Sequence, residues 1–172
     1  MKKINLFAFI PLAIFIAIGA MFLWGMYGKR VSKDESPLIG KPLTAISGGT
    51  LDGGTINLDN TSGQPLILNF FASWCAPCRD EHKQILQMAG ATKVKIIGIA
   101  YRDDPKETRN YIDELGNPYS DIIVDRQGGI GASLGLSGVP ETYIVGADGI
   151  IKYKHKGPIT PKDAPELLKK AQ

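Results

Sequence analysis

An uncharged stretch near the beginning of the chain restricts the folds that are open to the remainder. It covers residues 4–28, which are 25 consecutive residues without a charged side chain, most of them large and apolar. A helix of that length can span a bilayer. The rest of the 172-residue chain has the size of one ordinary globular domain. The sequence therefore predicts a transmembrane anchor over residues 1–28 and a single domain after it.

The flanks of this stretch favour a retained anchor over a cleaved signal peptide. A cleavable signal has a shorter apolar core that ends in small residues. The nearest run of small residues is 17–20, and the bulky residues 21–24 follow it directly. Trp24 and Tyr27 fall where aromatic side chains gather at a membrane interface. No cysteine lies near the stretch to carry a lipid.

The basic residues around the stretch give little preference for an orientation. Lys2 and Lys3 precede it, and Lys29, Arg30 and Lys33 follow it, so the positive-inside count is nearly equal. A very short N-terminus that leads at once into an apolar segment usually stays in the cytoplasm, while a long C-terminal domain is translocated largely regardless of its charge. The domain is therefore expected outside the cytoplasm.

A polar segment, residues 29–38, joins the anchor to the domain, which we expect to occupy residues 39–172. The segment contains Pro37 and has neither the strand nor the helix period, as is typical of a tether. The domain's basic residues are scattered, so its charge does not suggest a nucleic-acid partner. Two small lysine clusters are interpreted as solvated surface: Lys152, Lys154 and Lys156, and Lys169 and Lys170.

Apolar patterning in the domain alternates between the periods of strands and helices. Alternation and short apolar runs predict strands at residues 43–46, 55–58, 65–71, 94–100, 122–124, 142–145 and 150–153. Helical spacing and capping residues predict helices at residues 77–89, 105–115, 130–134 and 161–170. Gly48 and Gly49 are expected in a turn between the first two strands, and Asp104 is expected to cap the second helix. This order predicts an α/β fold, a mixed sheet with helices on both faces.

The chain has only two cysteines, and they lie in Trp74-Cys75-Ala76-Pro77-Cys78, between a predicted buried strand and a predicted helix. Backbone N–H groups and the helix dipole at such a position stabilise a thiolate. Cys75 is therefore predicted to be a nucleophile that solvent can reach. Cys78, one helical turn further, is predicted to be less exposed and to resolve the mixed disulfide that Cys75 forms with a partner protein.

A purely structural disulfide and a zinc site are weaker interpretations of the same cysteine pair. A structural disulfide that closes a loop of four residues would add only about 2 kcal/mol on a loop-entropy basis. A closed zinc site needs four ligands, and only His82, His155 and carboxylates remain to complete one. The sequence therefore predicts redox chemistry, with no metal and no cofactor other than the disulfide. His82 is interpreted as a surface or boundary residue, and Trp74 either contacts partners or is an ordinary half-buried aromatic.

The segment around the cysteines, Phe71-Ala72-Ser73-Trp74-Cys75-Ala76-Pro77-Cys78, resembles the active-site segment of the membrane-tethered, extracytoplasmic branch of the thioredoxin superfamily. Residues 98–104 (GIAYRDD) and 138–143 (GVPETY) resemble the cytochrome c biogenesis thiol:disulfide interchange proteins, the DsbE/CcmG family. The similarity runs from about Ile39 to the C-terminus. It implies a thioredoxin-like fold behind one N-terminal transmembrane helix, with the domain on the periplasmic side of a bacterial inner membrane.

The resemblance also implies roles for residues outside the cysteine motif. Val139–Pro140 is expected to be a cis peptide bond in a loop that faces the dithiol and offers backbone to a bound substrate strand. Glu141 then falls beside the site, either as a group that tunes the thiols or assists proton transfer, or as a solvated carboxylate. The other residues expected to bind substrate or tune the site are Trp74, Ala76 and Pro77.

One position departs from thioredoxins in general. The residue six before the first cysteine is a buried acid in that wider family, and here it is Asn69, which cannot accept a proton. A base that deprotonates Cys78 must therefore come from elsewhere, either Glu141 or Glu81 through water, unless the enzyme works without one.

The resemblance implies that the chain reduces disulfides in apocytochrome c, or in an intermediary maturation protein, so that haem can be attached. A membrane thiol reductase is expected to supply the electrons. Two other functions stay open: a general disulfide reductase of the cell envelope, and a thioredoxin-fold copper chaperone that holds Cu(I) between two thiolates with His155 as a third ligand. The spacing argues against the chaperone, because two residues separate the cysteines here instead of the three that are usual there.

Overall fold

The computed structural model describes residues 10–28, 36–58 and 63–171 of the chain. The chain divides into two compact units, Met1–Lys33 and Asp34–Gln172. In the first unit, residues Ile10–Gly28 form helix α1. Across the described residues, no helix is both long enough and apolar enough to cross a membrane. Residues 1–9 of the predicted anchor and residues 29–35 of the predicted tether lie outside the described residues.

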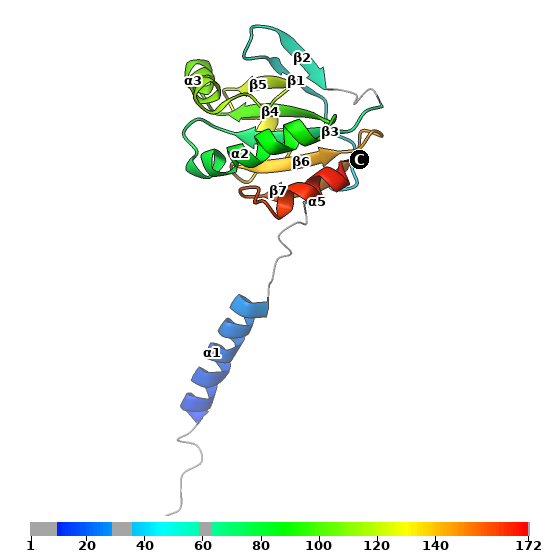
Figure 1. Cartoon of the computed structure of the whole chain (residues 1–172). Coiled ribbons are helices and arrows are strands. Elements are labelled where there is room, and N and C mark those ends of the chain that lie inside the picture. The colour runs from blue at the N-terminus through cyan, green and yellow to red at the C-terminus, as the bar shows by residue number, and fades with distance from the viewer. Residues whose placement is uncertain (1–9, 29–35, 59–62, 172) are drawn as a thin grey trace, which may run out of the picture. The chain divides into compact units, whose positions relative to one another are not determined.

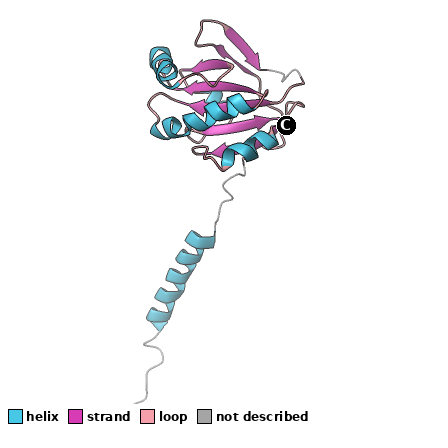
Figure 2. Ribbon diagram, in the orientation of Figure 1, coloured by secondary structure: helices cyan, strands magenta, loops and turns pink. Residues whose placement is uncertain are grey.

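A five-stranded mixed sheet forms the centre of the second unit (Figure 2). Its strands lie in the order β5-β4-β3-β6-β7. Strands β3, β4 and β5 are parallel, whereas β6 is antiparallel to β3 and β7 is antiparallel to β6. Their bounds are Leu66–Phe71 for β3, Lys95–Tyr101 for β4, Asp121–Asp125 for β5, Glu141–Val145 for β6 and Ile151–Lys156 for β7. The predicted mixed sheet is confirmed.

Helices cover both faces of this sheet, as predicted, but very unequally. On one face, α2 (Ala76–Ala91), α3 (Pro105–Leu115) and α5 (Asp163–Lys170) share a buried apolar cluster with the strands. Figure 1 shows α2 and α5 lying across this face. The other face has the short helix α4 (Gly129–Ser133) and a separate antiparallel hairpin, β1 (Ile46–Gly49) and β2 (Thr55–Leu58). Both cysteines belong to the apolar cluster on the face that carries the long helices.

Strand β3 is buried on both sides, and its side chains alternate between the two apolar clusters. Ile67 and Phe71 belong to the cluster under α2, whereas Leu68 and Phe70 belong to the opposite cluster. Because neighbouring residues of a strand point to opposite faces, Asn69 points towards α2. This polar side chain therefore lies within the interface between the sheet and the helix that carries the cysteines.

The hairpin differs from the prediction at its first strand. The predicted strand at residues 43–46 is wrong, because β1 begins at Ile46 and runs through Gly48 and Gly49, which were expected in the turn. A Cβ atom on Gly48 would lie 2.5 Å from Cγ2 of Ile123 in β5. Gly48 therefore permits the hairpin to pack closely on the sheet, and the chain turns a few residues later.

The remaining predicted strands and helices are present, with their ends displaced. Asp104 caps α3 as predicted, since its carboxylate accepts a hydrogen bond from the backbone N–H of Lys106 at 2.9 Å. Strand β7 extends to Lys156, beyond its predicted end at residue 153, because His155 and Lys156 pair with Thr142 and Glu141 of β6. Helix α5 begins at Asp163 instead of residue 161.

Candidate active site

The two cysteines form a disulfide at the junction between β3 and α2. Cys75 is the N-cap of α2, and its Sγ accepts a hydrogen bond from the backbone N–H of Cys78 at 3.2 Å. Pro77 lies in the first turn of the helix, where the N–H that it lacks has no helical partner. After reduction, the same N–H and the positive end of the helix dipole stabilise Cys75 as a thiolate.

Both cysteines are almost inaccessible in this oxidised state. Cys75 is 4% exposed and Cys78 is 1% exposed. The predicted order of exposure is kept, but the prediction that solvent reaches Cys75 is wrong for the oxidised chain, because its Sγ is held in the disulfide and packs in the cluster under α2. Ala76 and Pro77 are exposed, and Trp74 is 60% exposed. A partner that approaches Cys75 therefore meets this exposed rim, and Trp74 is not the half-buried aromatic of the alternative interpretation.

Asp103, which belongs to the GIAYRDD segment but was given no role from the sequence, fixes the loop that precedes the cysteines. Its carboxylate accepts hydrogen bonds from the backbone N–H and the hydroxyl of Ser73, both at 2.7 Å. It also accepts from the Thr108 hydroxyl at 2.9 Å and from the Asp104 N–H at 3.0 Å. The strand order could have indicated its position near the cysteines, because Asp103 follows β4, whose carboxyl end lies beside that of the parallel strand β3.

An open hollow of about 560 Å³ lies beside this loop. Ser73 and Trp74 line it, and Trp74 also donates its indole N–H to the carbonyl oxygen of Arg102 at 3.3 Å. The other lining residues are mostly polar or charged: Arg79, Arg102, Asp103, Asp104, Glu107, Asn110, Tyr111 and Glu114. The hollow therefore offers a partner both charged groups and the aromatic side chains of Trp74 and Tyr111 next to the cysteine motif.

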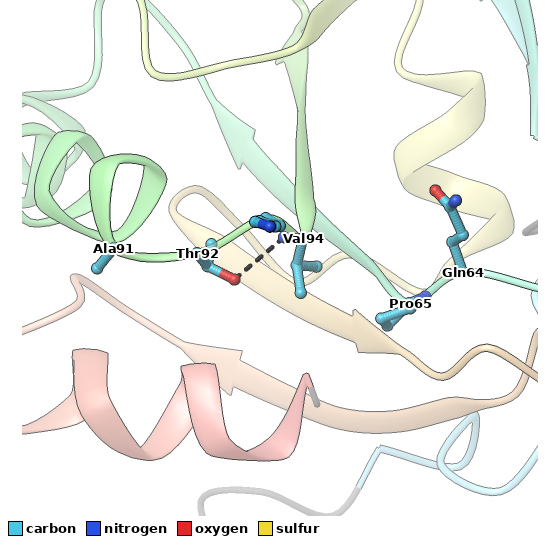
Figure 3. A pocket seen from close by; sticks show the side chains of 6 residues that line it. Gln64, Pro65, Ala91, Thr92 and Val94 are labelled. Carbon is cyan, nitrogen blue, oxygen red and sulfur yellow. Dashed lines mark hydrogen bonds between the residues drawn. The ribbon is translucent and has the colours of Figure 1, made fainter.

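A second hollow, of about 440 Å³, lies at the opposite end of the sheet, where β3 and β4 begin (Figure 3). Its lining residues are Gln64, Pro65, Ala91, Thr92, Lys93 and Val94. The backbone N–H of Val94 donates to the hydroxyl of Thr92 there, at 3.1 Å. Because β3 runs from this end towards the cysteines, the length of a strand separates the hollow from the dithiol, and we assign it no part in the chemistry.

Asn69 and Glu81 form a buried polar pair between β3 and α2. The Nδ2 of Asn69 donates to Oε1 of Glu81 and to Oγ1 of Thr142, at 3.0 Å in each case. The Oδ1 of Asn69 accepts from the Tyr119 hydroxyl at 2.8 Å. The second oxygen of Glu81 accepts from the backbone N–H of Ile159 at 2.7 Å. A buried carboxyl group is therefore present at this interface although the strand position itself carries an amide.

The environment of Glu81 suits it to proton transfer. Burial raises its pKa to about 7, although the hydrogen bonds from Ile159 and Asn69 oppose that shift. Glu81 lies three residues after Cys78, so the two side chains share one face of α2, and both are buried. A carboxyl group with a pKa near 7 exchanges protons readily at neutral pH. Of the two bases considered from the sequence, Glu81 is the one on the same face of the sheet as Asn69.

His82 is buried, which corrects its interpretation as a surface or boundary residue. Its Nε2 lies 2.9 Å from the carbonyl oxygen of Gly116, to which it donates. The Tyr111 hydroxyl lies 3.1 Å both from Nδ1 of His82 and from the carbonyl oxygen of Cys78. Burial lowers the pKa of His82, so the neutral ring is favoured. His82 therefore links α2 to α3 below the active site.

Val139–Pro140 is a cis peptide bond, as the resemblance implied. Pro140 directly precedes β6, and Glu141, the first residue of β6, pairs with Phe70 near the end of β3. Because β3 leads directly into the cysteine motif, this loop lies beside that motif. Val139 packs against the apolar cluster that contains both cysteines. The structure thus brings together the dithiol and the loop that the sequence placed more than 60 residues apart.

Glu141 points to the face of the sheet opposite to Glu81. Its neighbour Thr142 contacts Asn69, so alternation along β6 turns Glu141 the other way. On that face its carboxylate lies 2.8 Å from the ammonium group of Lys154. The interpretation of Glu141 as a solvated carboxylate is wrong, because the residue is 2% exposed. A role in tuning the thiols or in proton transfer stays a prediction that these contacts do not favour.

Among residues 10–28, 36–58 and 63–171, no group of three or more His, Cys, Asp or Glu side chains is arranged to hold a metal ion. His155, the third ligand of the copper alternative, lies on β7. Its Nε2 is 3.5 Å from the carbonyl oxygen of Pro158.

Comparison with known proteins relates the chain to thiol–disulfide chemistry. Residues 38–170 match the Redoxin family. The thiol:disulfide interchange protein DsbE of Escherichia coli (strain K12) is 38% identical over 167 residues, which cover 93% of this chain and 90% of that protein. A probable thiol:disulfide interchange protein DsbE-2 of Pasteurella multocida (strain Pm70) is 36% identical over 169 residues, 97% of this chain and 88% of that protein. The crystal structure of a putative DsbE from Chlorobium tepidum superposes with a TM-score of 0.69 at 20% identity, covering 77% of this chain and 94% of that one.

Proposed function

We propose, since the chain belongs to the DsbE family of thiol:disulfide interchange proteins within the wider Redoxin family, that it reduces a disulfide in apocytochrome c or in an intermediary maturation protein before haem is attached. The observation that carries the proposal is the Cys75–Cys78 disulfide at the N-terminus of α2, beside the loop that contains Val139 and Pro140. A thiol–disulfide oxidoreductase with this geometry needs no other cofactor.

The exchange proceeds in two steps. The thiolate of Cys75 attacks a disulfide of the target, so that one Cys75–target disulfide forms and the other target sulfur leaves as a thiolate. Cys78 then loses its proton and attacks the sulfur of Cys75, which releases the second target thiolate. The target gains two electrons, and the chain is left with the Cys75–Cys78 disulfide, which is the state of the present structure. A membrane thiol reductase then returns two electrons to this disulfide.

The proton of Cys78 requires an acceptor, and we assign this role to Glu81. The support is its position three residues after Cys78 on one face of α2, its burial, and its pKa of about 7. At that pKa an appreciable fraction of the carboxyl groups is ionised at neutral pH and can accept a proton. Asn69 holds Oε1 of Glu81 in place by the hydrogen bond at 3.0 Å.

The chain is further proposed to be anchored in a bacterial inner membrane with its domain on the periplasmic side. The support is the uncharged stretch of residues 4–28, of which Ile10–Gly28 are helical. An anchor raises the effective concentration of the domain near a membrane reductase and near membrane-bound maturation proteins. Resistance of the chain to alkaline extraction from membranes, together with its digestion by protease added to spheroplasts, tests this placement. Release into the soluble fraction would contradict it.

The reductase proposal is tested with the reduced full chain in detergent and an apocytochrome c peptide whose Cys-x-x-Cys-His motif is oxidised. We expect each chain to reduce one peptide disulfide while Cys75–Cys78 forms, and we expect the variants Cys75→Ser and Cys78→Ser not to complete the reaction. An unrelated disulfide peptide is the matched control. Equal rates with both peptides, together with unchanged c-type cytochromes in a strain that lacks the gene, would favour a general envelope reductase instead.

A further inference from the structure

A buried ion pair lies on the face of the sheet that is turned away from the dithiol. The ammonium group of Lys154, on β7, is 2.8 Å from Oε2 of Glu141, on β6, and the two side chains are 2% and 3% exposed. Lys154 also lies with its Nζ 4.8 Å from the centre of the Tyr143 ring. Lysine and glutamate are almost never buried to this extent without a partner, and the proposed exchange reaction uses neither charge.

The other contacts of the pair converge on one short segment, residues 134–137. Lys154 donates from Nζ to the carbonyl oxygen of Gly135 at 2.9 Å. Glu141 accepts from the backbone N–H of Ser137 at 3.3 Å and also from the Ser137 hydroxyl. The Tyr143 hydroxyl donates to the carbonyl oxygen of Leu134 at 2.8 Å. The strands β6 and β7 thus hold this segment through directed hydrogen bonds to its backbone.

The segment leads directly into the loop beside the active site. Ser137 is two residues before Val139, which packs against the cluster that contains both cysteines. The segment itself contains Gly135, which has a φ of +58°, and Gly138 follows it. Glycines restrict a backbone little, so the position of the loop depends on what holds it from outside.

We propose that Glu141 and Lys154 are positioning residues. They hold the backbone of residues 137–140 in the position in which a polypeptide partner can contact this loop and Cys75 at the same time. This inference rests on the proposed exchange with a polypeptide disulfide, but not on the identity of that polypeptide. It assigns the two charges to partner binding and gives Glu141 no part in proton transfer or in tuning the thiols.

An ion pair suits this task better than apolar side chains would. Apolar side chains of similar volume often give equal or greater stability than a buried ion pair, because both charges must be desolvated. They cannot accept a hydrogen bond from Ser137 or donate one to Gly135, however. The pair therefore contributes a defined loop position, and stability alone does not explain its presence.

The test compares three variants of the full chain in detergent: Glu141→Gln, Lys154→Met, and the double variant Glu141→Leu/Lys154→Met. Each single variant leaves one buried charge unpaired and is expected to unfold at a lower denaturant concentration. The double variant leaves none and is expected to unfold close to the wild-type concentration. Its KM for a disulfide-containing peptide is nevertheless expected to rise by at least about tenfold, because the segment loses its hydrogen bonds to both charged side chains, while its reduction potential stays the same.

A matched control lies at the start of the same strand. The double variant Asp148→Asn/Lys152→Met removes an exposed ion pair between the turn before β7 and Lys152 of β7 and is expected to change neither KM nor stability. If the Glu141→Leu/Lys154→Met chain does not fold, Ser137→Ala supplies the test, because it removes one hydroxyl from Glu141 and leaves both charges paired. We expect it to raise KM about threefold, the effect of a neutral hydrogen bond.

Two results would overturn the inference. One is a wild-type KM in the folded double variant, or in Ser137→Ala if that variant is needed. The other is a reduction potential that shifts in Glu141→Gln at unchanged KM, which would return Glu141 to the role of tuning the thiols. The assay uses the apocytochrome c peptide and an unrelated peptide in parallel. Failure of the proposed function appears as equal wild-type rates with the two peptides, whereas failure of this inference appears as unchanged KM values with both.

Discussion

The side-chain amide of Asn69 donates a hydrogen bond to the carboxylate of Glu81 across the interface between β3 and α2, at 3.0 Å. Asn69, at the position where thioredoxins in general have an acid, thus contacts an acid on the neighbouring helix. Because Glu81 is buried and its pKa is raised to about 7, it changes charge near neutral pH. Its titration should therefore be visible both in stability and in catalysis.

The stability of the oxidised chain should fall with rising pH through the titration of Glu81. The pKa of its carboxyl is 4.5 ordinarily and about 7 in the folded chain, so between these values the folded state holds a proton that the unfolded state has released. The full contribution is present below the lower value and is lost as pH rises through the higher one. We expect the loss to reach up to about 3 kcal/mol, and Glu81→Gln should abolish it.

The measurement is urea unfolding of the oxidised wild type and of Glu81→Gln from pH 4.5 to pH 8, a range that spans both pKa values. His82 acts in the opposite direction, because its lowered pKa removes stability as pH falls below the ordinary value of 6.5. That effect is common to both chains and cancels in their difference. Asp80→Asn, on an exposed position of the same helix, is the control. A difference that does not change with pH would contradict the assignment.

Replacement of Glu81 should also slow the second step of the exchange. Without a base, Cys78 loses its proton to water, and we expect release of the target to be about a hundredfold slower at pH 7, the range of general acid–base effects. The Cys75–target disulfide should then accumulate in Glu81→Gln and be visible on non-reducing gels. Cys78→Ala, in which resolution is impossible, gives the reference for full accumulation. Wild-type release in Glu81→Gln would mean that Cys78 needs no protein base.

Asp103 should be needed to hold the loop of Ser73 and Trp74. In the wild type, N–H and O–H donors bind both oxygens of the Asp103 carboxylate. Asparagine has only one acceptor oxygen, so in Asp103→Asn an NH₂ group faces some of these donors. We expect a loss of about 2 kcal/mol in the free energy of unfolding and faster alkylation of reduced Cys75, because the loop beside it loosens.

The neighbouring residue offers a matched control for this change. Asp104 is the N-cap of α3, a position where asparagine is as favourable as aspartate. Its ion pair with Arg126 is exposed, and such pairs contribute little. Asp104→Asn should therefore leave unfolding and alkylation almost unchanged. Equal effects of the two substitutions would show that Asp103 has no special part in holding the loop.

Much of the fold was predictable because it follows from local sequence. The apolar run at β3 and the Asp104-Pro105 start of α3 carry their own signals, and both elements are present. Gly48 was not placed correctly, since its small size matters only against Ile123, a contact between distant segments. Lys154 belongs to a lysine cluster that was interpreted as solvated surface. It is buried instead, because it pairs with Tyr143 of β6 and lies on the face of the sheet that also carries its partner Glu141, a residue of another strand.

In the candidate site, too, local sequence indicated some features, while others depend on contacts between distant segments. The cysteine motif and the proline loop could be identified from short segments, and so could Glu81 as a candidate base. The functions of Asp103 and His82 could not, because their partners Ser73 and Gly116 are about 30 residues away in the sequence and are brought near only by the packing of β4 and α3 against β3 and α2.

The reduction potential of the full chain distinguishes a reductant from an oxidant. The N–H of Cys78 and the N-terminus of α2 stabilise the Cys75 thiolate, which alone would favour the reduced form and make the chain oxidising. Burial of both cysteines and the nearby carboxyl of Glu81 disfavour the thiolate and act in the opposite direction.

For a reductant we expect a reduction potential of about −270 mV, similar to thioredoxin. Equilibration with glutathione or dithiothreitol, with Cys75→Ser and Cys78→Ser as blanks, gives the value. A potential of about −120 mV, the oxidant end of the scale, would mean that the chain inserts disulfides and that the proposed direction of electron flow is wrong.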